Sequence, residues 1–282
     1  MNTMTEKVCL VTGGTSGVGR SIAEACAREG ATVVIVSRDK VRGDLVAAEL
    51  SGETGNARIE ALTADMGSLA SVRKLAEAFL RKHARVHLLS LNAATLTMDR
   101  TVTPDGYESI FATNYLGHFA LTRHLQGALR ASRPARVIAV SGTPGSIKRI
   151  RLDMDDLMLN KGWNPLKATL RAAVAKALFM FELARRMEGA GVTANTFHPG
   201  IVRSNLPKSL PWYLGVPAGL AMSFVGRVSR TGVYLAIAPE AEGLTGSFFV
   251  SGRPAEFRPP YDLVQEAARL WEASERLMGS AP

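Results

Sequence analysis

The stretch that decides the fold lies close to the start of the chain, where residues 8–19 read VCLVTGGTSGVG. Its first half is apolar and β-branched, as in a buried strand. The glycines that follow permit a tight turn, and they let backbone N–H groups approach an anion at the start of the next helix. Such a turn predicts a dinucleotide pyrophosphate site, and a glycine-rich turn without a ligand is the alternative. The predicted contacts are Gly13, Thr15, Ser16, Gly17, Val18 and Gly19.

Beyond this stretch, short apolar runs alternate with segments of helical periodicity. Runs of Val, Ile, Leu and Ala without polar alternation are typical of strands that are buried on both faces of a parallel sheet. The pattern therefore predicts an α/β fold, a Rossmann-type doubly wound parallel sheet of about seven strands flanked by helices. The predicted strands are Val8–Thr12, Thr32–Val36, Arg58–Ala61, Val86–Leu91, Arg136–Val140, Val192–Phe197 and Ser247–Val250. The predicted helices are 18–29, 40–50, 68–83, 107–131, 167–189 and 228–238.

The remaining organisation is that of one domain. The 282 residues are 46% hydrophobic and 21% charged, which is the composition of a globular protein with a sizeable core. Prolines interrupt the strand–helix rhythm after residue 203, and the last part of the chain has the pattern of an amphipathic helix. We predict a single domain over residues 1–282, with a variable substrate-covering segment at about 203–227 and a helical tail at about 261–279.

Charge and cysteine content limit the classes of partner. Lys plus Arg is 34 and Asp plus Glu is 25, so the net charge is +9, but the basic residues are scattered and are not interleaved with aromatic residues. We therefore expect no nucleic-acid partner. No apolar run approaches the roughly 20 residues of a membrane-spanning helix, and the start of the chain lacks a signal-peptide pattern. Because the two cysteines also lack metal-ligand spacing, we expect a cytoplasmic protein without a metal or a membrane partner.

The end of the second predicted strand bears on which dinucleotide binds. An acid at this position usually binds the ribose 2′-hydroxyl of NAD(H), whereas an arginine suits the 2′-phosphate of NADP(H). Here Arg38 stands just after the end of the strand, and the acid, Asp39, stands one position later. We therefore favour NADP(H) over NAD(H), and a solvated loop cation is the alternative for Arg38.

Further motifs extend this pattern over the whole chain. The sequence reads NAA at residues 92–94, NYLGHF at 114–119, HPGIVRS at 198–204 and LWEASERL at 270–277. With these motifs the chain resembles the short-chain dehydrogenase/reductase family, in particular its retinol-dehydrogenase-like branch. The resemblance implies an oxidoreductase with a nicotinamide cofactor and a homodimer.

The resemblance also implies a cofactor contact at each motif. Asp65, followed by Met66, would lie at the adenine edge, and residues 92–94 would pass beneath the adenine ribose. The turn after residue 198 would pack on the nicotinamide and bond its carboxamide. A strand-end brace and a plain turn are the structural alternatives. The implied contacts are Asp65, Met66, Asn92, Ala93, Ala94, Pro199, Gly200, Ile201, Val202 and Ser204.

The chain departs from the family at the catalytic positions. The family uses a Tyr hydroxyl as proton donor, a Lys four residues later, a Ser that bonds the substrate carbonyl, and an Asn that supports a water relay. Only the Asn is present, as Asn114, whereas the Ser, Tyr and Lys positions hold Gly142, Thr169 and Ala173. Because an aliphatic hydroxyl without a cationic neighbour is a poor acid, we expect slow reduction of an isolated ketone.

Lys176 is the candidate for a compensating group. Positions 169, 173 and 176 lie close to one face of a helix, and helical side chains lean toward the N-terminus. We therefore hypothesise that Lys176 leans into the space left at Ala173, with a solvated or partner-facing lysine as the alternative. The catalytic candidates are Asn114, Thr169 and Lys176.

The segment after Ser204 indicates the substrate class. Its bulky apolar residues suit a large apolar or aromatic small molecule, and a surface helix pair or a dimer contact is the alternative. The substrate candidates are Gly142, Thr143, Trp212, Tyr213, Met222 and Phe224. We favour an NADP(H)-dependent oxidoreductase of specialised metabolism with a non-standard mechanism. A non-redox cyclase, isomerase or dehydratase and a cofactor-binding pseudoenzyme are the alternatives.

Overall fold

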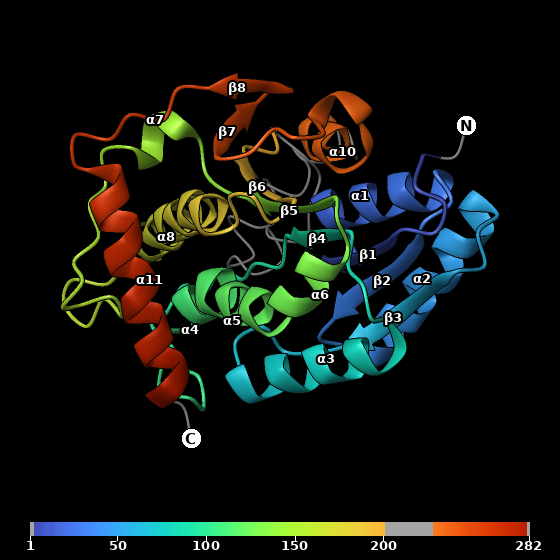
Figure 1. The fold of residues 1–282 in the computed structure, drawn as a ribbon. Coiled ribbons are helices and arrows are strands. Elements are labelled where there is room, and N and C mark those ends of the chain that lie inside the picture. Colours follow the sequence, from blue (N-terminus) through green and yellow to red (C-terminus); the bar gives the residue numbers. More distant parts are fainter. Residues whose placement is uncertain (1–2, 201–227, 281–282) are drawn as a thin grey trace.

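The computed structural model describes residues 3–200 and 228–280, and their strands form a single eight-stranded sheet (Figure 1). The strand order is β3-β2-β1-β4-β5-β6-β7-β8. The strands are β1 (Val8–Thr12), β2 (Thr32–Ser37), β3 (Ile59–Thr63), β4 (Leu88–Leu91), β5 (Ala135–Val140), β6 (Val192–Phe197), β7 (Ser247–Val250) and β8 (Arg253–Ala255). The α-helices are α1 (Gly17–Arg28), α2 (Lys40–Thr54), α3 (Leu69–Lys82), α4 (Ser109–Phe111), α5 (Gly117–His124), α6 (Gln126–Ala131), α7 (Pro144–Ile147), α8 (Pro165–Arg186), α10 (Arg230–Ile237) and α11 (Leu263–Ser280).

Strands β1 to β7 are parallel, and each of the seven predicted strands is present. The unpredicted strand β8 runs antiparallel to β7 at the edge of the sheet. The turn between them places Ser251 at φ 51° and Gly252 at φ 76°, a conformation that suits tight hairpins. Because β8 is three residues long and contains Pro254, it has no apolar run from which a strand could be predicted.

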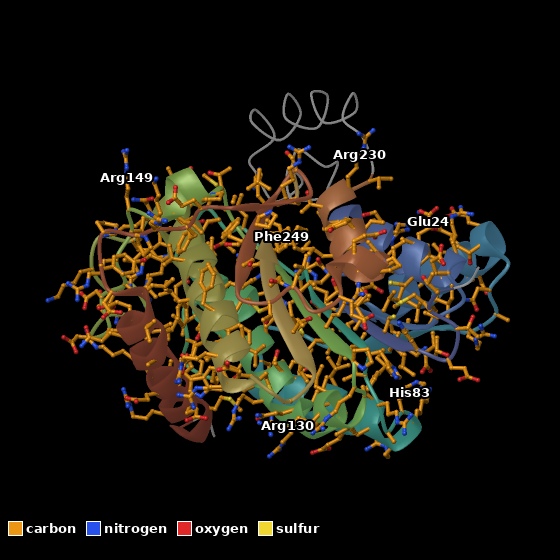
Figure 2. All side chains as sticks on the ribbon, turned by 45° about the horizontal axis from the view of Figure 1, so that its top comes forward. Glu24, His83, Arg130, Arg149, Arg230 and Phe249 are labelled. Carbon is orange, nitrogen blue, oxygen red and sulfur yellow. The ribbon has the colours of Figure 1, made fainter. Side chains whose placement is uncertain are left out.

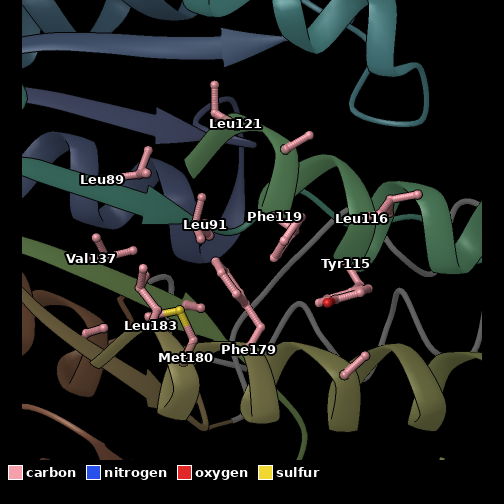
Figure 3. Close-up of a cluster of buried hydrophobic side chains, with 14 of the residues drawn as sticks. Leu89, Leu91, Tyr115, Leu116, Phe119, Leu121, Val137, Phe179, Met180 and Leu183 are labelled. Atoms are coloured by element: carbon pink, nitrogen blue, oxygen red, sulfur yellow. The ribbon is translucent and has the colours of Figure 1, made fainter. Parts of the chain in front are cut away.

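Side chains alternate between the two faces of the sheet. In β2, Val34 and Val36 belong to the core shared with α3, α5 and α8, whereas Val33 and Ile35 belong to the core shared with α1, α2 and α10. Figure 3 shows the first core, in which side chains of β4 and β5 meet Phe119 of α5 and Phe179 of α8. Helices therefore cover both faces, and the predicted doubly wound α/β architecture is confirmed.

Residues 107–131, predicted as one helix, form several shorter pieces. Helix α4 passes into a π-helical turn at Ala112–Leu116, and α5 and α6 follow with a break at Leu125. Such π-turns are rare and are frequently found at functional sites. The continuous apolar pattern of this stretch hides the break, because each piece is buried and periodicity alone cannot locate the change of helix type.

The predicted C-terminal tail is helical and packs along α8 as α11 (Figure 1). Its Trp271 is 2% exposed, with ring centroids 5.0 Å from Phe119 and 5.9 Å from Phe179. The Ser274 hydroxyl lies 2.6 Å from the Tyr115 hydroxyl. Within the described ranges, none of the helices has the length and apolarity needed to cross a bilayer.

Candidate functional site

The main polar cleft of the described residues lies at the carboxyl ends of the central strands and has a volume of about 720 Å3. It runs past the ends of β1 and β4, the neighbouring strands from which the chain winds in opposite directions. Open α/β sheets bind their ligands at this switch point, because the loops diverge there and leave a crevice.

The cleft brings the predicted cofactor residues together. Every described member of the set lines it: Gly13, Thr15, Ser16, Gly17, Val18, Gly19, Arg38, Asp65, Met66, Asn92, Ala93, Ala94, Pro199 and Gly200. The remaining members, Ile201, Val202 and Ser204, lie outside the described residues. Further lining residues were not predicted from the sequence, namely Val36, Ser37, Arg42, Ala64, Thr95, Thr113 and Val140, and Asp39 lines the cleft as well.

The glycine-rich turn has the geometry of a phosphate cradle. Gly13 and Gly17 have φ values of 64° and 54°, which disfavour a side chain. A Cβ on Gly13 would lie 2.9 Å from the Ala93 Cα, so the backbone itself forms the wall here. Ser16 precedes α1, and its side chain does not cap the helix. The first N–H groups of α1 are therefore left for an anion, as a dinucleotide pyrophosphate requires.

One hydroxyl joins the two strands that flank the cleft. The Thr12 Oγ1 at the end of β1 accepts hydrogen bonds from the backbone N–H groups of Asn92 at 2.9 Å and Ala93 at 3.2 Å. It also lies 3.1 Å from the Nε2 of His118. The Asn92 Oδ1 is buried beside the cleft without a hydrogen-bond partner among the described residues. A ligand hydroxyl would satisfy this acceptor, so the residues present fit a nicotinamide dinucleotide.

The tip of β2 presents two arginines to the cleft. Arg38 and Arg42 are exposed, and neither forms an ion pair within the described part of the chain. Asp39 instead caps α2, because its carboxylate accepts a hydrogen bond from the Arg42 backbone N–H at 3.0 Å. The Asp39 carboxylate at the strand tip therefore acts as the N-cap of α2. Arg42 was missed because its approach to the cleft depends on how α2 begins, although it stands four residues after Arg38.

The positions aligned with the family's Ser, Tyr and Lys lie together but carry no acid. A Cβ on Gly142 would lie 3.6 Å from the Ala173 Cβ, so these two positions are neighbours. The Thr169 hydroxyl donates to the Pro165 carbonyl of its own helix at 2.8 Å. It is therefore held by the helix backbone, as short hydroxyl side chains in helices often are.

No described tyrosine takes the place of the missing proton donor. The Tyr107 hydroxyl donates to the Leu277 carbonyl, and the Tyr261 hydroxyl donates to the Ile150 carbonyl. The Tyr115 hydroxyl is paired with the Ser274 hydroxyl. Neither these three nor Tyr234 of α10, the remaining described tyrosine, lines the cleft. Among the described residues there is also no group of three or more His, Cys, Asp or Glu side chains that could hold a metal ion.

Asn114 lies in the π-helical turn and braces the loop after β4. Its side-chain amide accepts from the Thr95 N–H at 2.7 Å and donates to the Thr95 carbonyl at 3.0 Å. Because both ends of the amide are used, the side chain positions Thr95, which lines the cleft. The backbone carbonyl of Asn114 lies 3.3 Å from the Nδ1 of His118.

Lys176 is buried, so the solvated alternative for it is excluded. The side chain is 4% exposed, and burial lowers the pKa of its ammonium to about 7. His118 is fully buried, and burial together with the charge on Lys176 lowers the pKa of its imidazole well below the usual value. Both groups are therefore buried in the core, where the charge on Lys176 acts on His118.

The predicted catalytic and substrate residues that the structure describes do not line the cleft. The wall of the cleft does not include Asn114, Gly142, Thr143, Thr169 or Lys176. Four substrate candidates, Trp212, Tyr213, Met222 and Phe224, lie outside the described residues. A second, mostly apolar cavity of about 550 Å3 lies between the end of α8, the start of β6 and the start of α11, and none of the predicted site residues within the described ranges lines it.

Comparison with known proteins identifies the family. The family model "short chain dehydrogenase" matches residues 7–153. Retinol dehydrogenase 12 of Bos taurus is 36% identical over 278 residues, which cover 97% of this chain and 86% of the relative. These names are those of oxidoreductases, so the chain has an oxidoreductase scaffold.

Solved structures agree on the fold. A crystal structure of an uncharacterised protein from Mycobacterium paratuberculosis matches with a TM-score of 0.73 and 28% identity, covering 98% of this chain and 94% of the other. RhlG of Pseudomonas aeruginosa, solved as an NADP complex, matches with a TM-score of 0.67 and 24% identity over 89% of this chain and 97% of the other. The chain belongs to the short-chain dehydrogenase/reductase family, in its retinol-dehydrogenase-like branch.

Proposed function

We propose that this protein is an NADP(H)-dependent oxidoreductase that acts on a bulky apolar or aromatic small molecule by a non-standard mechanism. The proposed preference for NADP(H) over NAD(H) rests on the side chains at the tip of β2. Arg38 and Arg42 face the cleft there, while one carboxylate oxygen of Asp39 is engaged in capping α2. Arginines bind phosphate through charge-assisted, bidentate hydrogen bonds, so the pair suits a 2′-phosphate.

The variant Arg38→Asp tests this choice. We expect the NADPH affinity to fall by about 10- to 100-fold, because a hydrogen bond to a charged group contributes about 1.5–3 kcal/mol, while the NADH affinity stays within about twofold. Titration of the protein with each dinucleotide, followed by fluorescence, measures both. Arg42→Gln should show the same selectivity with a smaller loss.

Arg130→Gln is the matched control. Arg130 is exposed on α6, which precedes β5 and so lies at the opposite end of the strands from the cleft. Figure 2 shows it extending outward from the molecule. An equal loss of affinity for both dinucleotides in Arg38→Asp, or no loss, would contradict the 2′-phosphate assignment.

The proposed mechanism follows from the missing acid. Bound NADP(H) would supply or accept a hydride at its nicotinamide. Gly142 and Ala173 offer no proton donor, and the Thr169 hydroxyl is bonded to its own helix. The proposed substrates are therefore those whose product anion is delocalised and weakly basic, such as quinones and conjugated enones. For such anions a proton from water is sufficient, and Asn114 keeps the loop after β4 in place.

Acceptor selectivity tests the mechanism. We expect NADPH consumption with a naphthoquinone or a conjugated cyclic enone to exceed that with a saturated cyclic ketone by at least about 100-fold, the usual contribution of acid catalysis. The measurement is the decay of the NADPH absorbance under anaerobic conditions. Equal rates with the ketone and the enone would contradict the proposal.

The missing acid also favours a second candidate, a non-redox cyclase, isomerase or dehydratase on the same scaffold. Such an enzyme would work by holding a reactive intermediate in a shaped pocket. Turnover by protein freed of dinucleotide, without any change in the NADPH absorbance, would support this candidate over the first. We also propose a cytoplasmic location. We further propose a homodimer, which light scattering of the purified protein tests.

A further inference from the structure

Thr113 is a polar side chain of the cleft wall that the proposed mechanism does not use. It lies in the π-helical turn between α4 and α5 and is half-buried. Threonines in helices often donate to the carbonyl four residues earlier, as Thr169 does. The Thr113 hydroxyl instead forms no hydrogen bond with the residues that the structure describes. It therefore presents one O–H donor to whatever binds in the cleft.

The π-helical turn packs directly on the residues that follow β3. Gly117, where the turn ends, has no room for a side chain, because the Met66 carbonyl oxygen occupies the place that a Cβ would take. A Cβ on Gly67 would lie 3.0 Å from the Thr113 Oγ1 and 3.3 Å from the Asp65 Oδ1. The hydroxyl and the carboxylate come from different elements, and both line the cleft. They therefore converge on one small region of its wall.

The Asp65 carboxylate is oriented by its own turn and keeps one oxygen for a ligand. Its Oδ1 accepts a hydrogen bond from the Gly67 N–H at 2.8 Å, and the Asp65 N–H donates to the Ser71 hydroxyl at 3.0 Å. Its Oδ2 forms no hydrogen bond or ion pair within the described ranges. Together with Thr113, Asp65 therefore offers a ligand one fixed acceptor beside one donor.

The order of the strands indicates which part of a dinucleotide meets this pair. The glycine-rich turn follows β1, the two arginines of the cleft follow β2, and Asp65 follows β3, and these strands are neighbours in the order β3-β2-β1. With the pyrophosphate at the first and the ribose 2′-phosphate at the second, the base on that ribose reaches the third. The nicotinamide then extends the other way, toward Val140 and Pro199 at the ends of β5 and β6.

We propose that Thr113 is a specificity-determining residue that recognises the edge of the adenine base, donating its hydroxyl proton to ring nitrogen N1 while the Asp65 Oδ2 accepts from the 6-amino group. Adenine presents an N–H donor at position 6 beside an acceptor at N1, which is the complement of this pair. The inference rests on the proposed function, because it requires a nicotinamide dinucleotide in the cleft. It does not depend on the 2′-phosphate.

Hypoxanthine has the same shape as adenine and the reversed pattern, with a carbonyl at position 6 and an N–H at position 1. Its carbonyl would face the Asp65 carboxylate, acceptor against acceptor, so this base cannot settle against Thr113. Sites that are built to hydrogen-bond a group discriminate strongly against an analogue that leaves their polar atoms unpaired. We therefore expect the cleft to prefer NADPH over its hypoxanthine analogue by at least about tenfold.

The test compares the affinities for NADPH and for its hypoxanthine analogue, both followed by fluorescence. Thr113→Val keeps the shape of the side chain and removes the hydroxyl. It should bind NADPH about 2- to 10-fold more weakly, which is the contribution of one neutral hydrogen bond, and the analogue within about twofold of the wild type. The preference for NADPH should fall accordingly. Thr113→Ser retains the hydroxyl and should retain the preference.

Asp65→Asn tests the other half of the pair. Because the Gly67 N–H holds the oxygen at Oδ1, the new amide should place its NH2 group where Oδ2 stood. This donor matches the carbonyl of hypoxanthine, so the preference should shift toward the analogue by at least about tenfold. Without such a shift, the assignment of position 6 of the base to Asp65 would be wrong.

Thr15→Val is the matched control, because it makes the same substitution in the glycine-rich turn of the same cleft. It should change both affinities by the same factor and leave the preference unaltered. Thr113→Ala, which also lacks the hydroxyl, replaces Thr113→Val if that variant does not fold.

The outcomes separate this inference from the proposed function. A wild-type protein without a base preference, or a preference that is equal in Thr113→Val and the wild type, overturns the role of Thr113 alone. If Arg38→Asp contradicts the 2′-phosphate assignment, NADH and its hypoxanthine analogue give the same comparison. Failure of the wild type to bind either NADPH or NADH overturns the proposed function as well.

Discussion

The double variant Thr169→Tyr/Ala173→Lys should reduce a simple aliphatic ketone with NADPH about 10²- to 10⁴-fold faster than the natural chain. The two positions lie one turn apart on α8, and Ala173 is the neighbour of Gly142. A tyrosine hydroxyl placed there would give the site a proton donor, and a lysine beside it would lower the pKa of that hydroxyl. Both positions are only half-buried, so larger side chains have room.

The control for this gain is Thr169→Phe/Ala173→Lys, which adds the same bulk and the same cation without the hydroxyl. Initial rates of NADPH oxidation at saturating ketone separate the two variants. If both accelerate the reaction equally, the gain comes from packing or charge and not from proton donation. The interpretation of positions 169 and 173 as the vacant acid site would then be wrong.

Replacing Trp271 by alanine should lower the free energy of unfolding by about 3–5 kcal/mol, which is typical of a large aromatic side chain removed from a core. The indole is 2% exposed and packs edge-on against Phe119. The guanidinium of Arg186 lies over its ring at 4.5 Å and that of Arg123 at 5.5 Å. The substitution therefore removes aromatic, apolar and cation–π contacts together.

Urea unfolding followed by circular dichroism measures this loss. Leu166→Ala is the control, because Leu166 is 68% exposed on α8 and should change stability by no more than about 0.5 kcal/mol. A change of less than about 1 kcal/mol for Trp271→Ala would mean that α11 contributes little to the core. The assignment of α11 as an integral part of the fold would then fail.

The fold could be predicted because its determinants are local. The runs Val8–Thr12 and Thr32–Val36 are buried on both faces, so their nearly continuous apolar sequence is itself evidence of a parallel strand. The glycine-rich sequence predicted the phosphate-binding turn because Gly13 and Gly17 adopt φ values that few other residues tolerate.

What could not be predicted depends on tertiary contacts. The burial of Lys176 is such a case, because a lysine in a helix is usually solvated and only the packing of α8 against the rest of the fold encloses it. Strand β8 is another, since its pairing is set by the turn at Ser251 and Gly252 and not by its own composition. The approach of Arg42 to the cleft likewise follows from the Asp39 cap.

The packing of α11 against α8 has a consequence for how copies of this protein can meet. Phe119 and Phe179 are shielded by a segment of the same polypeptide, so these two rings are not available to a second subunit. A protease that trimmed the chain before Leu263 would unmask a strip of aromatic rings. The shortened protein would expose these apolar rings and tend to aggregate. Helix α11 therefore prevents self-association through this aromatic surface.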